Sequence, residues 1–230
     1  MARQSVGVIM QNVSATVNQD PTQPTDGGAD FLLWLQFINR AQIEWAEAND
    51  WEVLRKNYYP TLAENSASMA SIGLPLDFRK LSGPVLNYSS GVDGGETWPE
   101  IPTERTKMFS TEDKFFTING DPSNGYYLLW NPGTLTSGAT VEIPYYSMPT
   151  SLASATQFPL VPDSEFLTNR TIAYILESRS DPRFQEQETK ARERLLMMIE
   201  NANLAKYEPY TNNVRVITPE NKFSFRFGRN

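Results

Sequence analysis

Three glutamates lie close to a tryptophan in the segment GETWPEIPTER. They are Glu96, Glu100 and Glu104, and Trp98 stands between the first two. A pair of carboxylates beside an aromatic ring is the side-chain set that glycoside hydrolysis requires. The prolines of this stretch, and the ease with which a β-rich lobe displays solvated carboxylates, favour a structural role. A carboxylate enzyme is therefore the third of the three functions that the sequence raises.

The composition removes most other catalytic chemistry. The chain has 230 residues and contains neither histidine nor cysteine. The usual general base, the Ser-His-Asp and Cys-His arrangements and the commonest transition-metal ligand are therefore missing. Disulfides and thiolate metal sites are excluded for the same reason. We expect a protein that is not an enzyme and that has no cofactor and no metal site.

The C-terminus holds a second set of residues, whose pattern suggests a binding function. In NKFSFRFGRN, Phe223, Phe225 and Phe227 alternate with polar residues, which is the period of a strand with one apolar face. A shorter alternation, Val214 with Val216, precedes it. Such a segment can add as a strand to another protein, where main-chain hydrogen bonds give affinity and alternate side chains fill pockets. It can also return to its own chain as a pair of edge strands.

Charge is divided unevenly along the chain, which has a net charge of −7. Residues 206–230 hold five basic and two acidic residues, whereas the first 205 residues hold 15 basic and 25 acidic ones. The acidic body argues against general nucleic-acid binding, because affinity for a phosphate backbone comes from clustered Lys and Arg. Lys222, Arg226 and Arg229 would steer the terminal segment toward an acidic partner surface.

Apolar spacing predicts helices at both ends of the acidic body. One stripe of apolar residues recurs at helical spacing within about residues 4–58 and again within about 163–205. The last helix should end near Ala205, because Pro209 follows. Helices at the two ends should pack together, since each amphipathic stripe needs a partner.

The middle of the chain, about residues 75–150, has the pattern of a small antiparallel sheet. Short alternating runs are separated by Gly, Asn, Asp and Pro, as between strands of hairpins. Aromatic pairs along hairpins mostly bury against each other. If they were exposed to solvent instead, the same aromatic rings could stack on sugars. A carbohydrate- or receptor-binding module that uses this aromatic lobe is therefore the second function considered.

The predicted fold class is α+β. A helical bundle formed by the N- and C-terminal helices carries an inserted small antiparallel β lobe and an extended C-terminal arm. Residues 1–205 form the body and residues 206–230 form the arm. No apolar run is long enough to span a membrane, and the N-terminus lacks the pattern of a signal peptide, so we expect neither insertion nor export.

The ordered features together resemble the head-to-tail adaptor (connector) proteins of tailed bacteriophages, particularly the podovirus tail tubular A-like type. The segment FLLWLQFINRAQIEWAEANDWEVLRK is similar to a helix of that family followed by Asn-x-Ala, an aromatic residue and Asp-Trp. GLPLDFRKL resembles its Leu-Pro-x-Asp-Phe stretch, LLWNP with TVEIPYYSMPTSL its β insert, and FPLVPDSEFLTNRTIAYIL its returning helix. The similarity covers most of residues 1–205 in order.

The resemblance implies a structural virion protein of the head–tail junction, made in the host cytoplasm. It implies a homo-oligomeric ring, commonly a dodecamer, between the portal protein and a tail nozzle or tail-tube protein. The helical part would build the ring wall around a channel through which DNA passes during ejection without sequence-specific binding. An acidic body fits such a channel, because like charge discourages phosphate contacts. Residues 1–205 would be the adaptor domain.

The resemblance also implies a role for each end of the subunit. The C-terminal arm would dock on the portal, through the residues Val214, Val216, Lys222, Phe223, Phe225, Arg226, Phe227 and Arg229. The β lobe would face the tail partner, through the aromatic residues Trp98, Tyr126, Tyr127 and Trp130.

Overall fold

A computed structural model of the chain describes residues 3–61, 70–88, 95–108, 113–121, 123–131 and 140–215. The chain divides into two compact units. Met1–Asn49 and Ser151–Asn230 form one, here called the helical unit, and Asp50–Thr150 form the other, the β unit. The β unit is thus inserted between two halves of the helical unit in the sequence.

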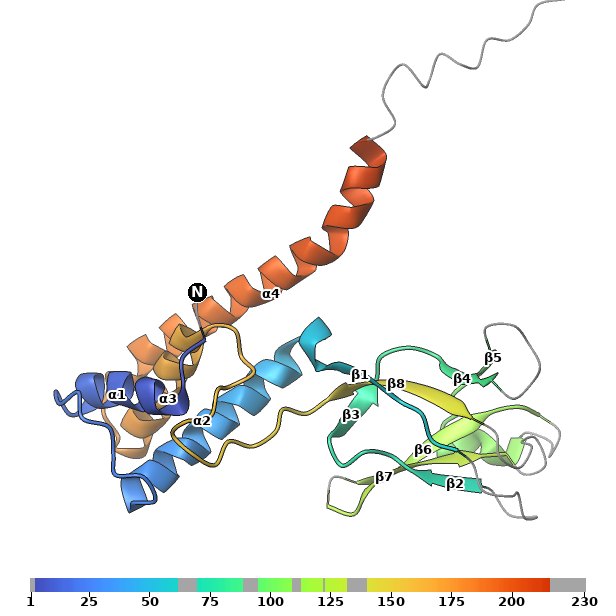
Figure 1. Ribbon diagram of the computed structural model, residues 1–230, viewed down its shortest axis with the longest axis horizontal. Helices are drawn as coiled ribbons and strands as arrows, with labels where there is room; N and C mark the ends of the chain where they lie inside the picture. The colour runs from blue at the N-terminus through green and yellow to red at the C-terminus, as the bar shows by residue number, and fades with distance from the viewer. Residues whose placement is uncertain are drawn as a thin grey trace, which may run out of the picture. The chain divides into compact units, whose positions relative to one another are not determined.

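The described part of the helical unit contains four α-helices (Figure 1). They are α1 (Val6–Val17), α2 (Ala29–Ala48), α3 (Ser164–Ser178) and α4 (Phe184–Arg215). Local caps start two of them: the Ser5 hydroxyl accepts a hydrogen bond from the Val8 amide, and the Asp163 carboxylate accepts from the Glu165 and Phe166 amides. These acceptors satisfy amides that have no partner within the helix.

The apolar stripes read from the sequence form the core of the helical unit. Helix α3 contacts α1, α2 and α4, so it lies at the centre of the unit. The buried side chains of α1, α2 and α3 include Val6, Ile9, Met10, Val13, Phe31, Trp34, Leu35, Ile38, Trp45, Phe166, Leu167, Ile172 and Ile175. The predicted packing of N-terminal on C-terminal helices is confirmed.

Two helix boundaries differ from the prediction. Helix α2 ends at Ala48, close to the predicted end near Asn49, and a short 3₁₀ turn, η1 (Glu52–Leu54), follows as expected. The N-terminal helical region nevertheless stops at Leu54 rather than near residue 58, because the chain enters a strand at Arg55. Helix α4 does not end near Ala205 but continues to Arg215, with Pro209 inside it. Proline removes one backbone hydrogen bond and bends a helix without always ending it. The axis of α4 turns in its C-terminal part (Figure 1).

A hydrogen-bonded ion pair joins α2 to α3. The Glu44 carboxylate accepts from the Arg170 Nε at 2.7 Å and from the Tyr174 hydroxyl at 2.8 Å. The guanidinium of Arg170 and that of Arg40 also lie 4.5 Å and 4.4 Å from the centroid of the Tyr174 ring. Burial, followed by the bond to Glu44, raises the pKa of Tyr174. One carboxylate thus orients two side chains of the central helix.

Replacing Glu44 by glutamine should lower the free energy of unfolding of the helical unit by about 1 kcal/mol. The change removes the charge that two donors share, and the value allows for the partial exposure of the pair to water. The urea midpoint measures the effect. Glu47→Gln, on the same helix and exposed, is the control, and it should change the free energy by less than about 0.5 kcal/mol. Equal effects of the two changes would contradict this role of Glu44.

The β unit contains two antiparallel sheets in its described part. The larger has the order β1 (Arg55–Tyr58), β8 (Val141–Ser147), β4 (Val85–Asn87) and β5 (Glu96–Trp98), and β3 (Phe78–Leu81) pairs with β8 as well. The smaller has the order β2 (Ala70–Gly73), β7 (Gly125–Trp130) and β6 (Phe116–Asp121). A 3₁₀ helix, η3 (Thr103–Met108), lies between β5 and β6 in the sequence. The predicted antiparallel lobe is confirmed, although strand pairing begins at Arg55.

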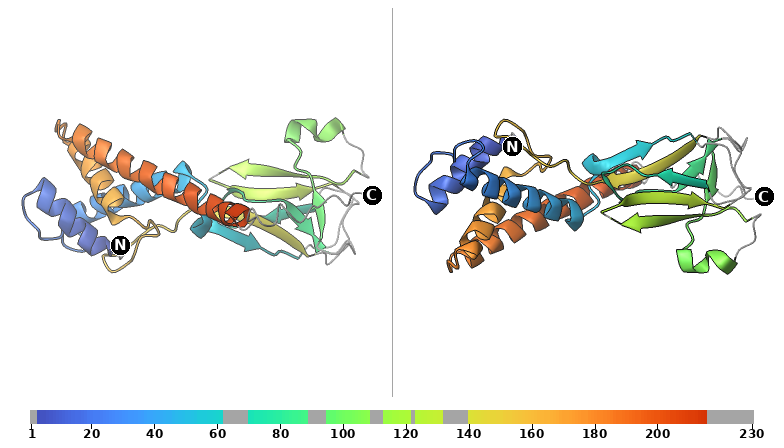
Figure 2. Two further views of the ribbon diagram at one scale, coloured as in Figure 1. Left: turned by 90° about the horizontal axis from the view of Figure 1, so that it is seen from above. Right: turned by 90° about the horizontal axis from the view of Figure 1, so that it is seen from below.

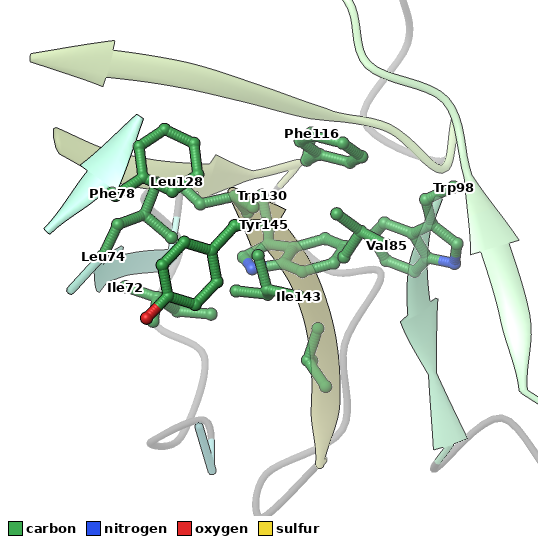
Figure 3. Packing of buried hydrophobic residues seen from close by; sticks show 11 residues of the cluster. Ile72, Leu74, Phe78, Val85, Trp98, Phe116, Leu128, Trp130, Ile143 and Tyr145 are labelled. Atoms are coloured by element: carbon green, nitrogen blue, oxygen red, sulfur yellow. The ribbon is translucent and has the colours of Figure 1, made fainter. Parts of the chain in front are cut away.

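The core of the β unit is aromatic and joins the two sheets (Figure 3). The rings of Trp98 and Trp130 meet edge to face, with centroids 4.6 Å apart and an interplanar angle of 78°. The ring of Phe116, on the neighbouring strand β6, lies 5.6 Å from the ring of Trp130, centroid to centroid. Alternation along β7 explains the arrangement, because Leu128 and Trp130 point to the core while Tyr127 points away.

A second contact in this core involves Tyr145, whose hydroxyl loses its proton only at high pH. The Tyr145 hydroxyl donates to Asp77 Oδ1 at 3.1 Å, and the other oxygen of Asp77 accepts from the Lys56 ammonium at 2.6 Å. Burial, and then the bond to Asp77, raises the pKa of Tyr145 to about 12. The neutral hydroxyl is the form that the folded β unit stabilises.

The raised pKa of Tyr145 makes the stability of the β unit fall at alkaline pH. Its contribution is complete below the unfolded value of about 10. The contribution is lost as the pH rises toward 12, because the unfolded chain releases the proton first. We expect Tyr145→Phe to remove the tyrosinate absorbance that develops near pH 12 and to flatten the loss of stability between pH 10 and 12. An unchanged titration curve would contradict the assignment.

Candidate functional site

The three glutamates of the segment GETWPEIPTER do not form a catalytic pair. Glu96 on β5 accepts a hydrogen bond from the Lys114 ammonium at 2.7 Å, and this bond holds its pKa below the usual range. A catalytic acid needs the opposite shift. Glu100 and Glu104 are exposed, the first in an isolated backbone bridge to Phe116 and the second on η3. Their surroundings are those of solvated surface carboxylates.

The described residues also show no site for a metal ion. Among them, no group of three or more acidic residues is arranged to hold a cation. A groove of about 710 Å³ in the helical unit lies between α1, α3 and α4 and is lined mainly by polar side chains. Within it, Arg194 of α4 forms an ion pair with Glu165 of α3. Nor does any helix in the described part have the length and hydropathy needed to cross a bilayer.

The aromatic residues predicted to face a tail partner divide into two groups. Trp98 and Trp130 are buried in the core of the β unit, so their assignment to an exposed surface is wrong. The alternating pattern of β7 turns Trp130 inward. Tyr126 is half buried and packs against Phe78, with ring centroids 5.6 Å apart. Tyr127, at 39% exposure, remains open to a partner.

An exposed tyrosine cluster, absent from the predicted site, lies on the larger sheet. Glu142 of β8 accepts hydrogen bonds from the Asn57 amide at 2.8 Å and from the Tyr59 hydroxyl at 3.0 Å. Its other oxygen accepts from the Tyr88 hydroxyl, and this bond raises the pKa of Tyr88. The rings of Tyr59 and Tyr88 remain exposed, at 55% and 43%. The set Asn57, Tyr59, Tyr88 and Glu142 is called the tyrosine cluster below.

The tyrosine cluster has the properties of a protein-binding surface. Its two rings offer apolar area, and their hydroxyls are already held by one carboxylate, so little side-chain freedom remains to be lost on binding. Asn57 lies on β1 and Glu142 on β8, 85 positions apart in the sequence. Tyr59 follows β1, and Tyr88 follows β4. Only the sheet topology brings them together, so no local pattern in the sequence could have identified the cluster.

The residues predicted to dock on a portal lie near the C-terminus of the chain. Val214 belongs to α4, whose backbone is helical there, so the predicted strand through Val214 and Val216 is wrong at its first residue. The other predicted residues lie outside the described part of the chain: Val216, Lys222, Phe223, Phe225, Arg226, Phe227 and Arg229.

Comparison with known proteins gives one family. A family model described as SU10 adaptor protein matches residues 4–215, which include the whole β unit, most of the helical unit and all four helices of the described part. No curated protein matches the chain.

Proposed function

The chain belongs to the SU10 adaptor protein family, a family of phage head-to-tail adaptors, and from this premise we propose that it forms a ring between the portal and the tail. Membership makes it a structural protein of the virion, in a family that is not an enzyme class. The observation that carries the proposal is the extent of the match, which spans the helical unit and the inserted β unit together.

The ring is proposed as a dodecamer whose wall is built by the helical unit. A subunit that carries two different contact surfaces assembles head to tail, and such contacts close into rings. The excess of acidic over basic residues in the first 205 positions suits a channel for DNA, since phosphates are repelled from an acidic wall. DNA would then pass without binding any particular sequence.

The C-terminal arm, redefined as residues 216–230, is proposed to dock on the portal. The family match and α4 both end at residue 215, and the arm that follows contains three alternating phenylalanines, Phe223, Phe225 and Phe227, among basic residues. The rings would fill apolar grooves, and the cations would steer the arm to acidic surface.

The β unit is proposed to face the next tail component, a nozzle or tail-tube protein. The exposed residues that support this role are the tyrosine cluster and Tyr127. The alternative of a carbohydrate-binding module is less well supported, because Trp98 and Trp130 of the aromatic lobe are buried and could not stack on a sugar.

The assembled mass tests the proposed ring. Purified protein, alone and mixed with the portal of the same phage, should give a species with the mass of twelve 26.0 kDa chains, free or added to the portal. Mass photometry resolves such a species from single chains. A protein that stays monomeric at micromolar concentration, with the portal and without it, would overturn the proposal.

A further inference from the structure

Helix α4 extends well beyond the helix on which it packs. The ion pair between Arg194 and Glu165 places the beginning of α3 beside Arg194, since α3 starts at Ser164. From there α4 continues to Arg215, a further length of about 30 Å at 1.5 Å per residue. This part of α4 lies beyond the start of α3.

The first ten residues of this extension are unusually apolar for an exposed helix. Leu196, Met197 and Leu204 each expose more than half of their surface. Three further apolar side chains, Leu195, Met198 and Ile199, are only half buried. A helix with apolar residues on every side is normally covered on every side. We call residues Leu195–Leu204 the α4 patch.

Helix α2 carries a second exposed apolar surface. Its buried stripe faces the core, and on the opposite side Leu32, Leu33 and Ile43 are exposed at helical spacing. Arg40 shares that side. These four residues are called the α2 patch. Helices α2 and α4 are separate elements of the helical unit, and Figure 2 shows both of them from above and from below.

The two patches carry opposite charges that have no ion-pair partner. The Arg40 guanidinium lies over the Tyr174 ring and forms no salt bridge within the described part of the chain. Glu193, just before the α4 patch, and Glu200, within it, stand one turn before and one turn after Leu196 and Met197. Neither carboxylate has a salt bridge to a described residue. A contact between the patches would therefore bury apolar surface and bring an arginine to a glutamate.

We propose that the α4 patch of one subunit packs on the α2 patch of a second copy of this chain. The two patches differ, so the contact is heterologous and each subunit uses both, as a closed ring requires. The inference rests on the proposed ring and names the surfaces that close it. A portal subunit is the competing occupant of the α4 patch.

Cysteine cross-linking tests the contact directly, because the natural chain has no cysteine. Ile43→Cys and Leu196→Cys are made in separate chains that carry tags of different length. The two variants are co-expressed with the portal and treated with a short bismaleimide. We expect a cross-linked dimer of one chain of each kind. Each variant expressed alone should give none, and Ile43→Cys with Glu186→Cys, an exposed position earlier on α4, is the matched control.

The outcomes separate this inference from the proposed ring. Rings of full mass without the 43–196 dimer would overturn the inference and leave the ring intact. Cross-linking of Cys at position 196 to the portal in place of the second chain would also overturn it. Absence of any ring, with both variants folded by circular dichroism, would overturn the ring and the inference together.

Discussion

Trp130→Ala should remove about 3–5 kcal/mol from the free energy of unfolding of the β unit. The side chain is fully buried and contacts the ring of Phe116 on the neighbouring strand β6 and the ring of Trp98 on β5, a strand of the other sheet. Alanine would leave a large cavity at the junction of the two sheets, since β5 belongs to one sheet and β6 to the other. Figure 3 shows the ring of Trp130 in the middle of this cluster.

Hydrogen exchange of the paired amides of β6 and β7 measures this loss locally. Tyr127→Ala is the control, because Tyr127 lies on the same strand as Trp130, β7, and its side chain points away from the core. Its expected cost is below about 1 kcal/mol. If both variants lost the same protection, the inward role of Trp130 would be refuted, and an exposed aromatic surface through Trp130 would have to be reconsidered.

Deletion of residues 216–230 should weaken binding to the portal by roughly 100-fold or more, a loss expected when several aromatic anchors leave an interface. The deletion removes Phe223, Phe225 and Phe227 with their neighbouring cations. It begins at residue 216 because α4 is helical to Arg215, and an earlier cut would shorten that helix. Co-sedimentation with portal rings gives the affinity.

Two variants, each with three substitutions, refine the deletion. Replacing the three phenylalanines by serine should reproduce most of the loss at any salt concentration. Replacing Lys222, Arg226 and Arg229 by glutamine should slow association mainly at low salt, since exposed charges act through a screened field. The Ser224→Ala chain serves as the control and should bind normally. Undiminished binding by the deleted chain would refute the role of the arm.

Much of the fold could be predicted from the sequence because its signals are local. The stripe Val6, Ile9, Met10 and Val13 repeats at helical spacing, and all four side chains are buried. The alternation of β7 likewise fits its pattern of burial. The resemblance to head-to-tail adaptors rested on the order of several such segments, and the family match confirms it.

The remaining features depend on tertiary structure. Whether Trp98 faces the core or a partner depends on which sheet covers it, and a three-residue strand carries too little pattern to decide. The tyrosine cluster needs β1 and β4 on opposite edges of β8, a pairing that no local residue specifies. The end of α4 near Ala205 is predicted from Pro209, whereas the helix continues to Arg215. The weak helix formers that follow Pro209, such as Thr211 and Asn212, give no local signal for this extension.

Electron microscopy of the protein bound to its portal tests the central claim most directly. The account predicts a second ring on the portal, coaxial with it, whose wall is helical and whose central channel continues the portal channel. Density for the β unit should lie on the side away from the portal. Single chains scattered on the portal surface, or a portal ring without added density, would contradict the account.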